Sequence, residues 1–289
     1  MRKYSFSAPE TKQELFDLIA ASADMEVEFL AGGTDLVPRI NMERDEIPYE
    51  EKKPMMIISL EKLGLAGITE AEGRIEIGAL TTIEQIQDSE LIRSKAPALA
   101  DAADQLAGFA IRNTATIGGN IMNASPAADT VPPLMAMGAC VVTESAEGEE
   151  ACLLADFMTG VKKTAIKPGA ILTKIVIEPG KGGTGFVKLG RRAAETLSVV
   201  NAAAYVEQED GVCTKACVVI GSCAPTAVVC EAAAAALVGK KINQAVIDEA
   251  VKSVDAVISP IDDVRSSAWY RREVAPVAAG RAIAAAAGL

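Results

Sequence analysis

The sequence predicts an α/β or α+β fold whose carboxyl-terminal third forms a small separate domain of sheet and helices. Strand-like and helix-like runs alternate over the first two thirds of the chain. The composition then changes after a glycine-rich loop at 178–185, beyond which alanine-rich helical runs dominate. The 289 residues, 50% of them hydrophobic, can bury about three quarters of the unfolded surface, which is enough for two or three packed subdomains.

The first part of the chain reads as helix, strand, turn and helix. We expect a helix over 11–22, because apolar residues recur there at helical spacing behind a proline and a threonine. An apolar run over 27–31 ends at Gly32-Gly33 and leads through two polar residues into another apolar stretch. This pattern predicts a strand, a tight turn and a helix, followed by a charged, proline-containing connection over 43–54.

The middle of the chain continues this alternation. Thr81 is the expected cap of the first helix in this part, and a second glycine pair, Gly118-Gly119, precedes the last one. The expected strands lie at 55–60, 74–77 and 140–143, and the expected helices lie at 81–87, 96–107 and 130–138.

The last third begins with a flexible loop at 178–185. Strand character follows, with alternation of apolar and polar residues in only parts of each run. The expected strands lie at 198–206 and 215–221, and the expected helices lie at 227–238, 243–253 and 270–287.

Charge and histidine content exclude several classes of function. Lys plus Arg number 28 against 39 Asp plus Glu, so the net charge is −11, and no long basic patch occurs. This argues against a nucleic-acid or anionic-membrane partner. Histidine is absent, which excludes Ser-His-Asp and Cys-His nucleophiles, HExxH zinc sites, 2-His-1-carboxylate iron sites and a flavin tethered through histidine.

The absence of long apolar runs and the spacing of the cysteines indicate the compartment of the protein. The chain contains no long uncharged apolar run and no signal-peptide core at its start, so we expect a soluble, cytoplasmic protein. The six cysteines lack CxxC spacing, which favours plain thiols in a reducing compartment over a metal site.

The two glycine pairs are the candidate binding features. Each stands between a strand-like run and a helix-like run, and adjacent glycines adopt positive φ without steric cost. Successive N–H groups can then point into one concavity and bind an anion, and two such nests suit a pyrophosphate-bridged dinucleotide. The alternative is that each pair makes only a tight turn. Neither segment is a GxGxxG fingerprint, and no GxxxxGK[ST] motif occurs.

Asp129 follows the second pair and precedes an expected helix. It can serve as an ordinary helix N-cap, or it can accept hydrogen bonds from sugar hydroxyls, and the residues alone favour neither role.

These segments resemble a known family, the flavin-binding medium subunits of molybdenum hydroxylases such as xanthine, carbon monoxide and nicotinate dehydrogenases. The resemblance runs in family order and spacing over nearly the whole chain. It is carried by FLAGGTDL at 29–36, IRNTATIGGNIMNASPAAD at 111–129, FVKLGRR at 186–192, APT at 224–226 and SAWYRR at 267–272.

The resemblance implies an α+β fold in two parts. The first is a two-lobed FAD-binding region of the PCMH type, like that of vanillyl-alcohol-oxidase flavoproteins, at 1–176 with lobes at about 1–55 and 56–176. The second, at 177–289, is a carboxyl-terminal domain of antiparallel sheet and helices.

The resemblance also implies the cofactor-binding residues. Two segments would form pyrophosphate-binding loops. Two single residues would line the site or bind the sugar hydroxyls of FAD. The first loop comprises Phe29, Leu30, Ala31, Gly32, Gly33, Thr34, Asp35 and Leu36. The second comprises Thr116, Ile117, Gly118, Gly119 and Asn120, while Ala107 is the small lining residue and Asp129 the sugar-binding one.

Two further positions follow from the resemblance. Leu172 matches an apolar residue that packs on the flavin, the alternative being a strand residue of the core. Lys188 matches a lysine near the flavin ring, where a cation would raise the reduction potential. The alternative for Lys188 is a solvated lysine at a strand end.

The function implied is that of an FAD-dependent oxidoreductase subunit in a hetero-oligomer. Hydroxylation would occur on a large molybdopterin subunit, and a small subunit with [2Fe-2S] clusters would deliver electrons to non-covalent FAD. The FAD would pass them to NAD or another acceptor, so this chain needs no catalytic side chain and no metal of its own. The alternatives are a self-sufficient FAD-dependent oxidoreductase and a non-enzymatic scaffold.

Overall fold

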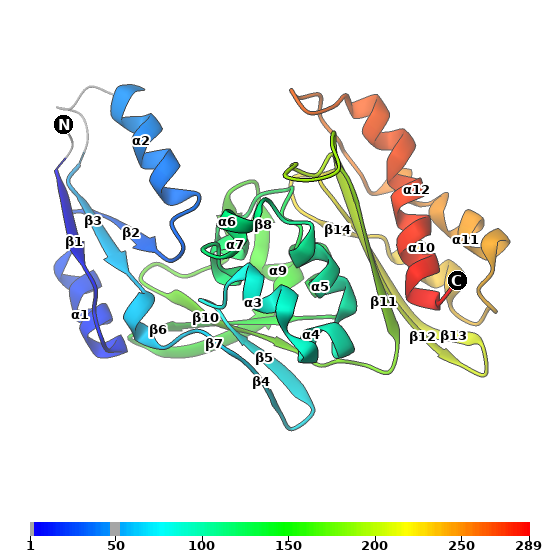
Figure 1. Ribbon diagram of the computed structural model, residues 1–289, viewed down its shortest axis with the longest axis horizontal. Helices are drawn as coiled ribbons and strands as arrows, with labels where there is room; N and C mark the ends of the chain where they lie inside the picture. The colour runs from blue at the N-terminus through cyan, green and yellow to red at the C-terminus, as the bar shows by residue number, and fades with distance from the viewer. Residues whose placement is uncertain (1–2, 47–52) are drawn as a thin grey trace.

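The computed structural model describes residues 3–46 and 53–289 and divides into three layered parts. Figure 1 shows a small amino-terminal lobe in blue, a central lobe in cyan and green, and a carboxyl-terminal sheet with helices in yellow to red. The two-lobed α+β region followed by an antiparallel sheet with helices is the fold that the family resemblance predicts, and the prediction is confirmed.

The amino-terminal lobe is a parallel sheet with the order β1-β3-β2 and two helices. The helix predicted over 11–22 is confirmed. Thr11 caps it by accepting a hydrogen bond from the Glu14 N–H at 3.2 Å. The elements are β1 (Tyr4–Ser7), α1 (Lys12–Ala21), β2 (Glu26–Leu30), α2 (Leu36–Glu46) and β3 (Met55–Ser59). Helix α2 extends into the expected connection over 43–54, and residues 47–52 of that connection lie outside the described residues.

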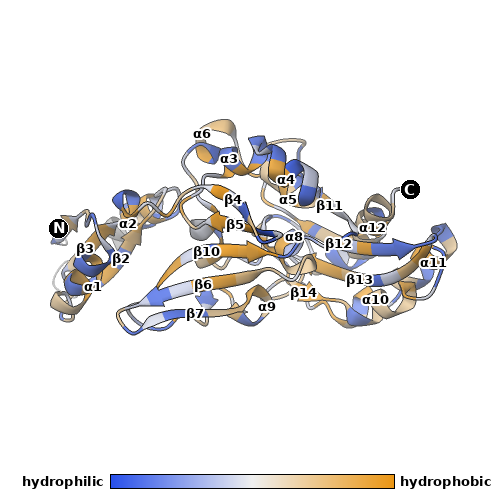
Figure 2. Ribbon diagram, turned by 90° about the horizontal axis from the view of Figure 1, so that it is seen from below, coloured by the Kyte–Doolittle hydropathy of each residue, from blue (hydrophilic) through white to orange (hydrophobic). Residues whose placement is uncertain are grey.

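The central lobe is built on an antiparallel sheet with the order β4-β5-β10-β6-β7. Its middle strand, β10, is almost entirely buried, and Figure 2 shows the hydrophobic residues of β10 and β6 side by side. The strands are β4 (Ile68–Ala71), β5 (Arg74–Gly78), β6 (Cys140–Ser145), β7 (Gly148–Leu153) and β10 (Ile171–Ile177), with the short hairpin β8 (Met158–Gly160) and β9 (Lys163–Thr164). Of these, only β5 and β6 were predicted; β4, β7, β8, β9 and β10 were not.

Short helices cover this sheet. The cap of α3 is Thr82, which forms a capping box with Gln85, so the expectation of Thr81 as cap is wrong. The Thr81 hydroxyl is fully buried and bonds the backbone of Gly67 instead. The helices are η2 (Glu61–Leu63), α3 (Ile83–Asp88), α4 (Glu90–Lys95), α5 (Pro97–Asp104), α6 (Phe109–Arg112), α7 (Ile117–Met122), α8 (Val131–Ala136) and α9 (Leu154–Phe157).

The carboxyl-terminal part is an antiparallel sheet with the order β11-β12-β13-β14, covered by helices. The helix expected over 227–238 begins only at Glu231, because residues 228–229 pair with β13. The expected loop at 178–185 likewise gives way to a strand at Gly183. The elements are β11 (Gly183–Leu189), β12 (Val200–Glu209), β13 (Val212–Gly221), β14 (Val228–Val229), α10 (Glu231–Leu237), α11 (Gln244–Val251), η3 (Val254–Ala256) and α12 (Ala268–Ala287).

This sheet is buried on both faces, which explains the weak alternation in its sequence. Ala203 packs into the core of the central lobe, whereas its neighbours Ala202 and Ala204 belong to the core beneath the carboxyl-terminal helices. Glycines on β11 let α12 approach closely, since a Cβ on Gly185 would lie 2.3 Å from the Ala282 carbonyl oxygen. The sheet therefore joins the two parts of the chain through a shared apolar layer.

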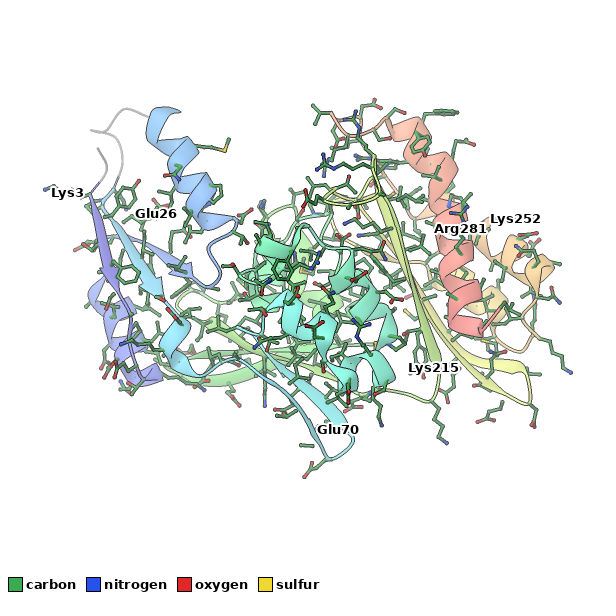
Figure 3. All side chains as sticks on the ribbon, in the orientation of Figure 1. Lys3, Glu26, Glu70, Lys215, Lys252 and Arg281 are labelled. Atoms are coloured by element: carbon green, nitrogen blue, oxygen red, sulfur yellow. The ribbon has the colours of Figure 1, made fainter. Side chains whose placement is uncertain are left out.

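Many charged side chains lie at the periphery. The side chains of Lys3, Glu70 and Lys252, labelled in Figure 3, lie at the edges of the molecule, and Arg281 is exposed on α12. Over the described ranges 3–46 and 53–289, no helix combines the length and the apolar character needed to cross a bilayer.

Candidate functional site

A groove runs between the amino-terminal lobe and the central lobe. It consists of a cavity of about 630 Å³ and an adjoining cavity of about 410 Å³. Both are lined by Phe29 and Ala31 from the end of β2 and by Gly119 and Met122 from α7. The two segments that carry the glycine pairs therefore face each other across one groove, although they are far apart in the sequence.

The first glycine pair forms an open loop at the rim of the larger cavity. Within the described part of the chain, no protein acceptor is found for the backbone N–H groups of Gly32, Gly33, Thr34 and Asp35. Gly33 has a φ of +69°, which favours glycine. Gly32 serves close packing, because a Cβ there would lie 1.9 Å from the Thr114 carbonyl oxygen. The loop thus presents unpaired donors to the groove, as an anion-binding nest requires.

The second glycine pair has a different conformation. Gly118 and Gly119 form the first turn of α7, neither has a positive φ, and Thr116 caps the helix by accepting from the Gly119 N–H at 3.0 Å. The N–H groups of Ile117 and Gly118 donate to the carbonyl oxygens of Thr81 and Ala79. The expectation of a second nest with positive φ is therefore wrong, because these donors already have partners inside the protein.

The second pair instead allows close approach of the backbone. A Cβ on Gly118 would lie 2.6 Å from the Ala79 carbonyl oxygen, so only glycine fits beside that segment. A Cβ on Gly119 would have the Thr116 hydroxyl at 3.0 Å as its nearest neighbour, and Gly119 lines both cavities. Asn120 also lines the larger cavity, and its side-chain oxygen accepts a hydrogen bond from Thr130 at 2.7 Å.

Asp129 and Lys188, predicted separately, form an ion pair at 2.7 Å, and their side chains are only 6% and 4% exposed. The other carboxylate oxygen of Asp129 accepts from the Ser198 hydroxyl at 2.5 Å and the Asn201 amide at 2.8 Å. Lys188 also donates to the Gln105 carbonyl oxygen at 2.7 Å. We call these residues the Asp129 network. Because Asp129 and Gln105 belong to the central lobe and the others to β11, β12 and the loop between them, the network links two parts of the chain.

Two of the alternatives considered from sequence are now excluded. Asp129 does not cap α8, whose capping residue is Thr130 without a side-chain cap, and Lys188 is not solvated. Neither residue lines the two cavities of the groove. Ser198 and Asn201 were not predicted, although a polar residue inside an apolar strand such as β12 is a signal of a buried hydrogen-bonded partner.

The remaining predicted residues divide between the groove and its supports. Leu172 is 4% exposed and lines the smaller cavity, so it is at once a core residue and a wall of the groove. Leu30 and Ile117 support the two loops without lining either cavity. Ala107 has a φ of +45° and follows Leu106, which lines the larger cavity.

Four polar residues that line the larger cavity were missed by sequence reasoning. Arg39 on α2 forms an ion pair with Glu28 on β2 at 2.7 Å. Lys162, in the turn between β8 and β9, bonds Asn123 and faces Asp35. Asn123 lies within the motif at 111–129, whereas no local pattern marks Lys162, because only folding brings the β8–β9 turn to the amino-terminal lobe.

Comparison with known proteins gives matches over almost the whole chain. The family described as the FAD binding domain in molybdopterin dehydrogenase matches residues 2–179. The family described as the CO dehydrogenase flavoprotein C-terminal domain matches residues 186–286. The groove, with both glycine pairs, lies within the first match.

Individual relatives agree with these matches. The chain is 32% identical to the nicotinate dehydrogenase FAD-subunit of Eubacterium barkeri, covering 94% of this chain and 92% of the relative. It is 30% identical to the carbon monoxide dehydrogenase medium chain of Afipia carboxidovorans, covering 88% and 86%. A chain of the reconstituted CO dehydrogenase from Oligotropha carboxidovorans superposes with a TM-score of 0.90 at 28% identity, covering 100% of this chain and 98% of that one.

Proposed function

The chain belongs to the family of FAD-binding medium subunits of molybdenum hydroxylases, and on this premise we propose that it holds FAD in the groove and transfers electrons within such an enzyme. The single observation that supports this placement is the row of unpaired N–H groups over Gly32–Asp35 at the rim of the groove. Those donors are what the diphosphate of a dinucleotide requires.

The residues present fit FAD. The unpaired donors of the first loop match the diphosphate oxygens, and Gly119 leaves the opposite wall free of a side chain. The smaller cavity has an apolar lining that includes Leu60, Ile171 and Leu172, which suits an aromatic ring system. A histidyl link to the cofactor is excluded because the sequence contains no histidine, and FAD would bind without a covalent link.

The FAD-binding region would end near residue 176, at the end of β10, and the carboxyl-terminal domain would occupy 177–289. The Asp129 network then fixes one part against the other at the end of α5, where Gln105 accepts from Lys188. Asp129 and Lys188 would in this way support the cofactor site from outside its two cavities, and Ala107, next to Leu106, would line the site.

The proposed division of labour places the hydroxylation chemistry outside this chain. Bound FAD supplies two-electron redox chemistry that can also exchange single electrons, and in this role it would connect [2Fe-2S] clusters of a small subunit with NAD or another acceptor. A large molybdopterin subunit would carry the substrate. This chain binds and orients the cofactor and excludes water from its apolar end, and none of its side chains is required to act as a general base or nucleophile.

The experiment is to purify the chain at native expression level and to identify its cofactor and the chains that accompany it. Stoichiometric FAD together with a molybdopterin subunit and an iron–sulfur subunit is the expected result. A colourless chain that stays colourless after incubation with FAD contradicts the cofactor assignment. A chain that turns over a small substrate without companions contradicts the assignment as an electron-transfer subunit.

A further inference from the structure

A lysine from the central lobe is held over the first glycine loop by a strained turn. Lys162 lies between β8 and β9 with a φ of +57°, and its N–H donates to the carbonyl oxygen of Ala124 at 2.9 Å. Ala124 has a φ of +44°, so two non-glycine residues in the left-handed region are bonded to each other. Such conformations are unfavourable for L-residues and persist at functional sites when the surrounding structure holds them in place.

The side chain of Lys162 spans the groove. Its ammonium donates to the Asn123 side-chain oxygen and lies 3.6 Å from the Asp35 carboxylate, which belongs to the opposite wall. Lys162, Asn123 and Asp35 all line the larger cavity. The cation is therefore placed beside the loop whose N–H groups have no acceptor among the described residues.

The charged residues of the larger cavity indicate that Lys162 is free to pair with a bound anion. Its charged lining residues are Glu28, Asp35, Arg39 and Lys162. Arg39 is bound to Glu28 at 2.7 Å, whereas the Lys162–Asp35 pair is longer and both side chains are 55% exposed. A half-exposed pair at this distance is weak and exchanges readily for a better partner. An anion bound at Gly32–Asp35 would be repelled by the Asp35 carboxylate unless a cation compensated its charge.

We infer that Lys162 binds the diphosphate of the cofactor, exchanging the Asp35 carboxylate for a diphosphate oxygen. The inference rests on the proposed function and adds a residue that the glycine motifs do not mark. Asn123 and the bond to Ala124 hold the lysine in position, so little side-chain freedom is lost when the anion arrives. The site then combines backbone donors from the amino-terminal lobe with a side-chain cation from the central lobe.

The test measures binding of FAD, ADP and riboflavin to the FAD-free chain, by flavin fluorescence and by calorimetry, at several salt concentrations. Lys162→Met is expected to weaken FAD and ADP by about tenfold, because a charge-assisted contact to the diphosphate is lost. Riboflavin, which has no phosphate, should bind as it does to the wild type. The salt dependence of FAD binding should also be smaller in the variant.

Two variants serve as controls. Lys163→Met removes the same charge from the neighbouring residue, which is exposed and does not line the larger cavity, and should bind all three probes normally. Lys162→Arg keeps the charge and should retain most of the FAD affinity. Wild-type binding of FAD and ADP by Lys162→Met overturns the inference, as does an equal loss of riboflavin, which would indicate a structural defect. Failure of the wild type to bind FAD would overturn the proposed function as well.

Discussion

The Asp129 network gives the sharpest prediction, because it sets a structural role for Asp129 against a cofactor-binding role. Replacement of Asp129 by Ala would leave the Lys188 ammonium buried, with Gln105 as its remaining partner. The donors of Ser198 and Asn201 would lose their acceptor in the same step. We therefore expect Asp129→Ala to destabilise the FAD-free chain itself.

The magnitude follows from the burial of the pair. Removal of one partner from a buried ion pair costs about 3–5 kcal/mol, because the charge that remains is uncompensated. Side-chain exposures of 6% and 4% place this pair in that class. The double variant Asp129→Leu/Lys188→Met removes both charges, so its loss should be smaller than the sum of the single losses.

The assay is urea unfolding of the FAD-free chain, followed by circular dichroism and by the fluorescence of Trp269, the single tryptophan of the sequence. Asp156→Ala is the matched control, since this carboxylate is exposed on α9, and its free energy of unfolding should stay within about 0.5 kcal/mol of wild type. If Asp129→Ala unfolds like the control while FAD affinity falls by about 1–3 kcal/mol, the carboxylate serves the cofactor and the reasoning is refuted.

Three further predictions concern the second glycine pair, stability in acid and the reactivity of the thiols. Gly118→Ala should lower the free energy of unfolding by about 1–3 kcal/mol, because its Cβ would meet the Ala79 carbonyl at 2.6 Å. Gly119→Ala should leave stability within about 1 kcal/mol and instead weaken FAD binding; equal stability losses would contradict this. Burial would raise the pKa of Asp263, but hydrogen bonds from Arg271 and from the side chain and amide of Arg265 outweigh it and hold the pKa below its ordinary value. Its contribution to stability is therefore present above pH about 4 and is lost as the pH falls toward the folded pKa, and Asp263→Asn should flatten acid unfolding in that window. Burial raises the pKa of Cys223 to about 12, so iodoacetamide at about pH 8 should label exposed Cys152 first and Cys223 only after unfolding, as read by mass spectrometry. Rapid native labelling of Cys223 would contradict its burial.

Local signals predicted the elements whose ends are fixed by their own side chains. Helix α1 begins behind Thr11 as expected, because its cap lies within one turn. Strand β7 was missed, since its residues are exposed throughout and only pairing with β6 makes them a strand. The run at 227–238 was predicted as one helix, yet its β-branched residues 228–229 pair with β13 as a strand. In both cases pairing with the preceding strand decided the conformation.

In the candidate site, too, some features were predictable from local sequence and others depend on tertiary contacts. In the first loop, the expected positive φ is found at Gly33. The second pair was misinterpreted, since the need for glycine at position 118 arises from the Ala79 backbone, which is remote in sequence. Lys162 had no sequence signal, because its role depends on a turn that folding carries to the opposite wall.

The sequence by itself determined the family, the α+β class, the absence of histidine chemistry and the segments that line the groove, because motifs and composition are properties of the chain. Only the tertiary structure decided which N–H groups are unpaired, which glycines serve close approach, and that Asp129 and Lys188 neutralise each other in the interior. The physical reason is that hydrogen bonding and ion pairing depend on which groups lie within about 3 Å of each other, and residues distant in sequence come that close only through packing.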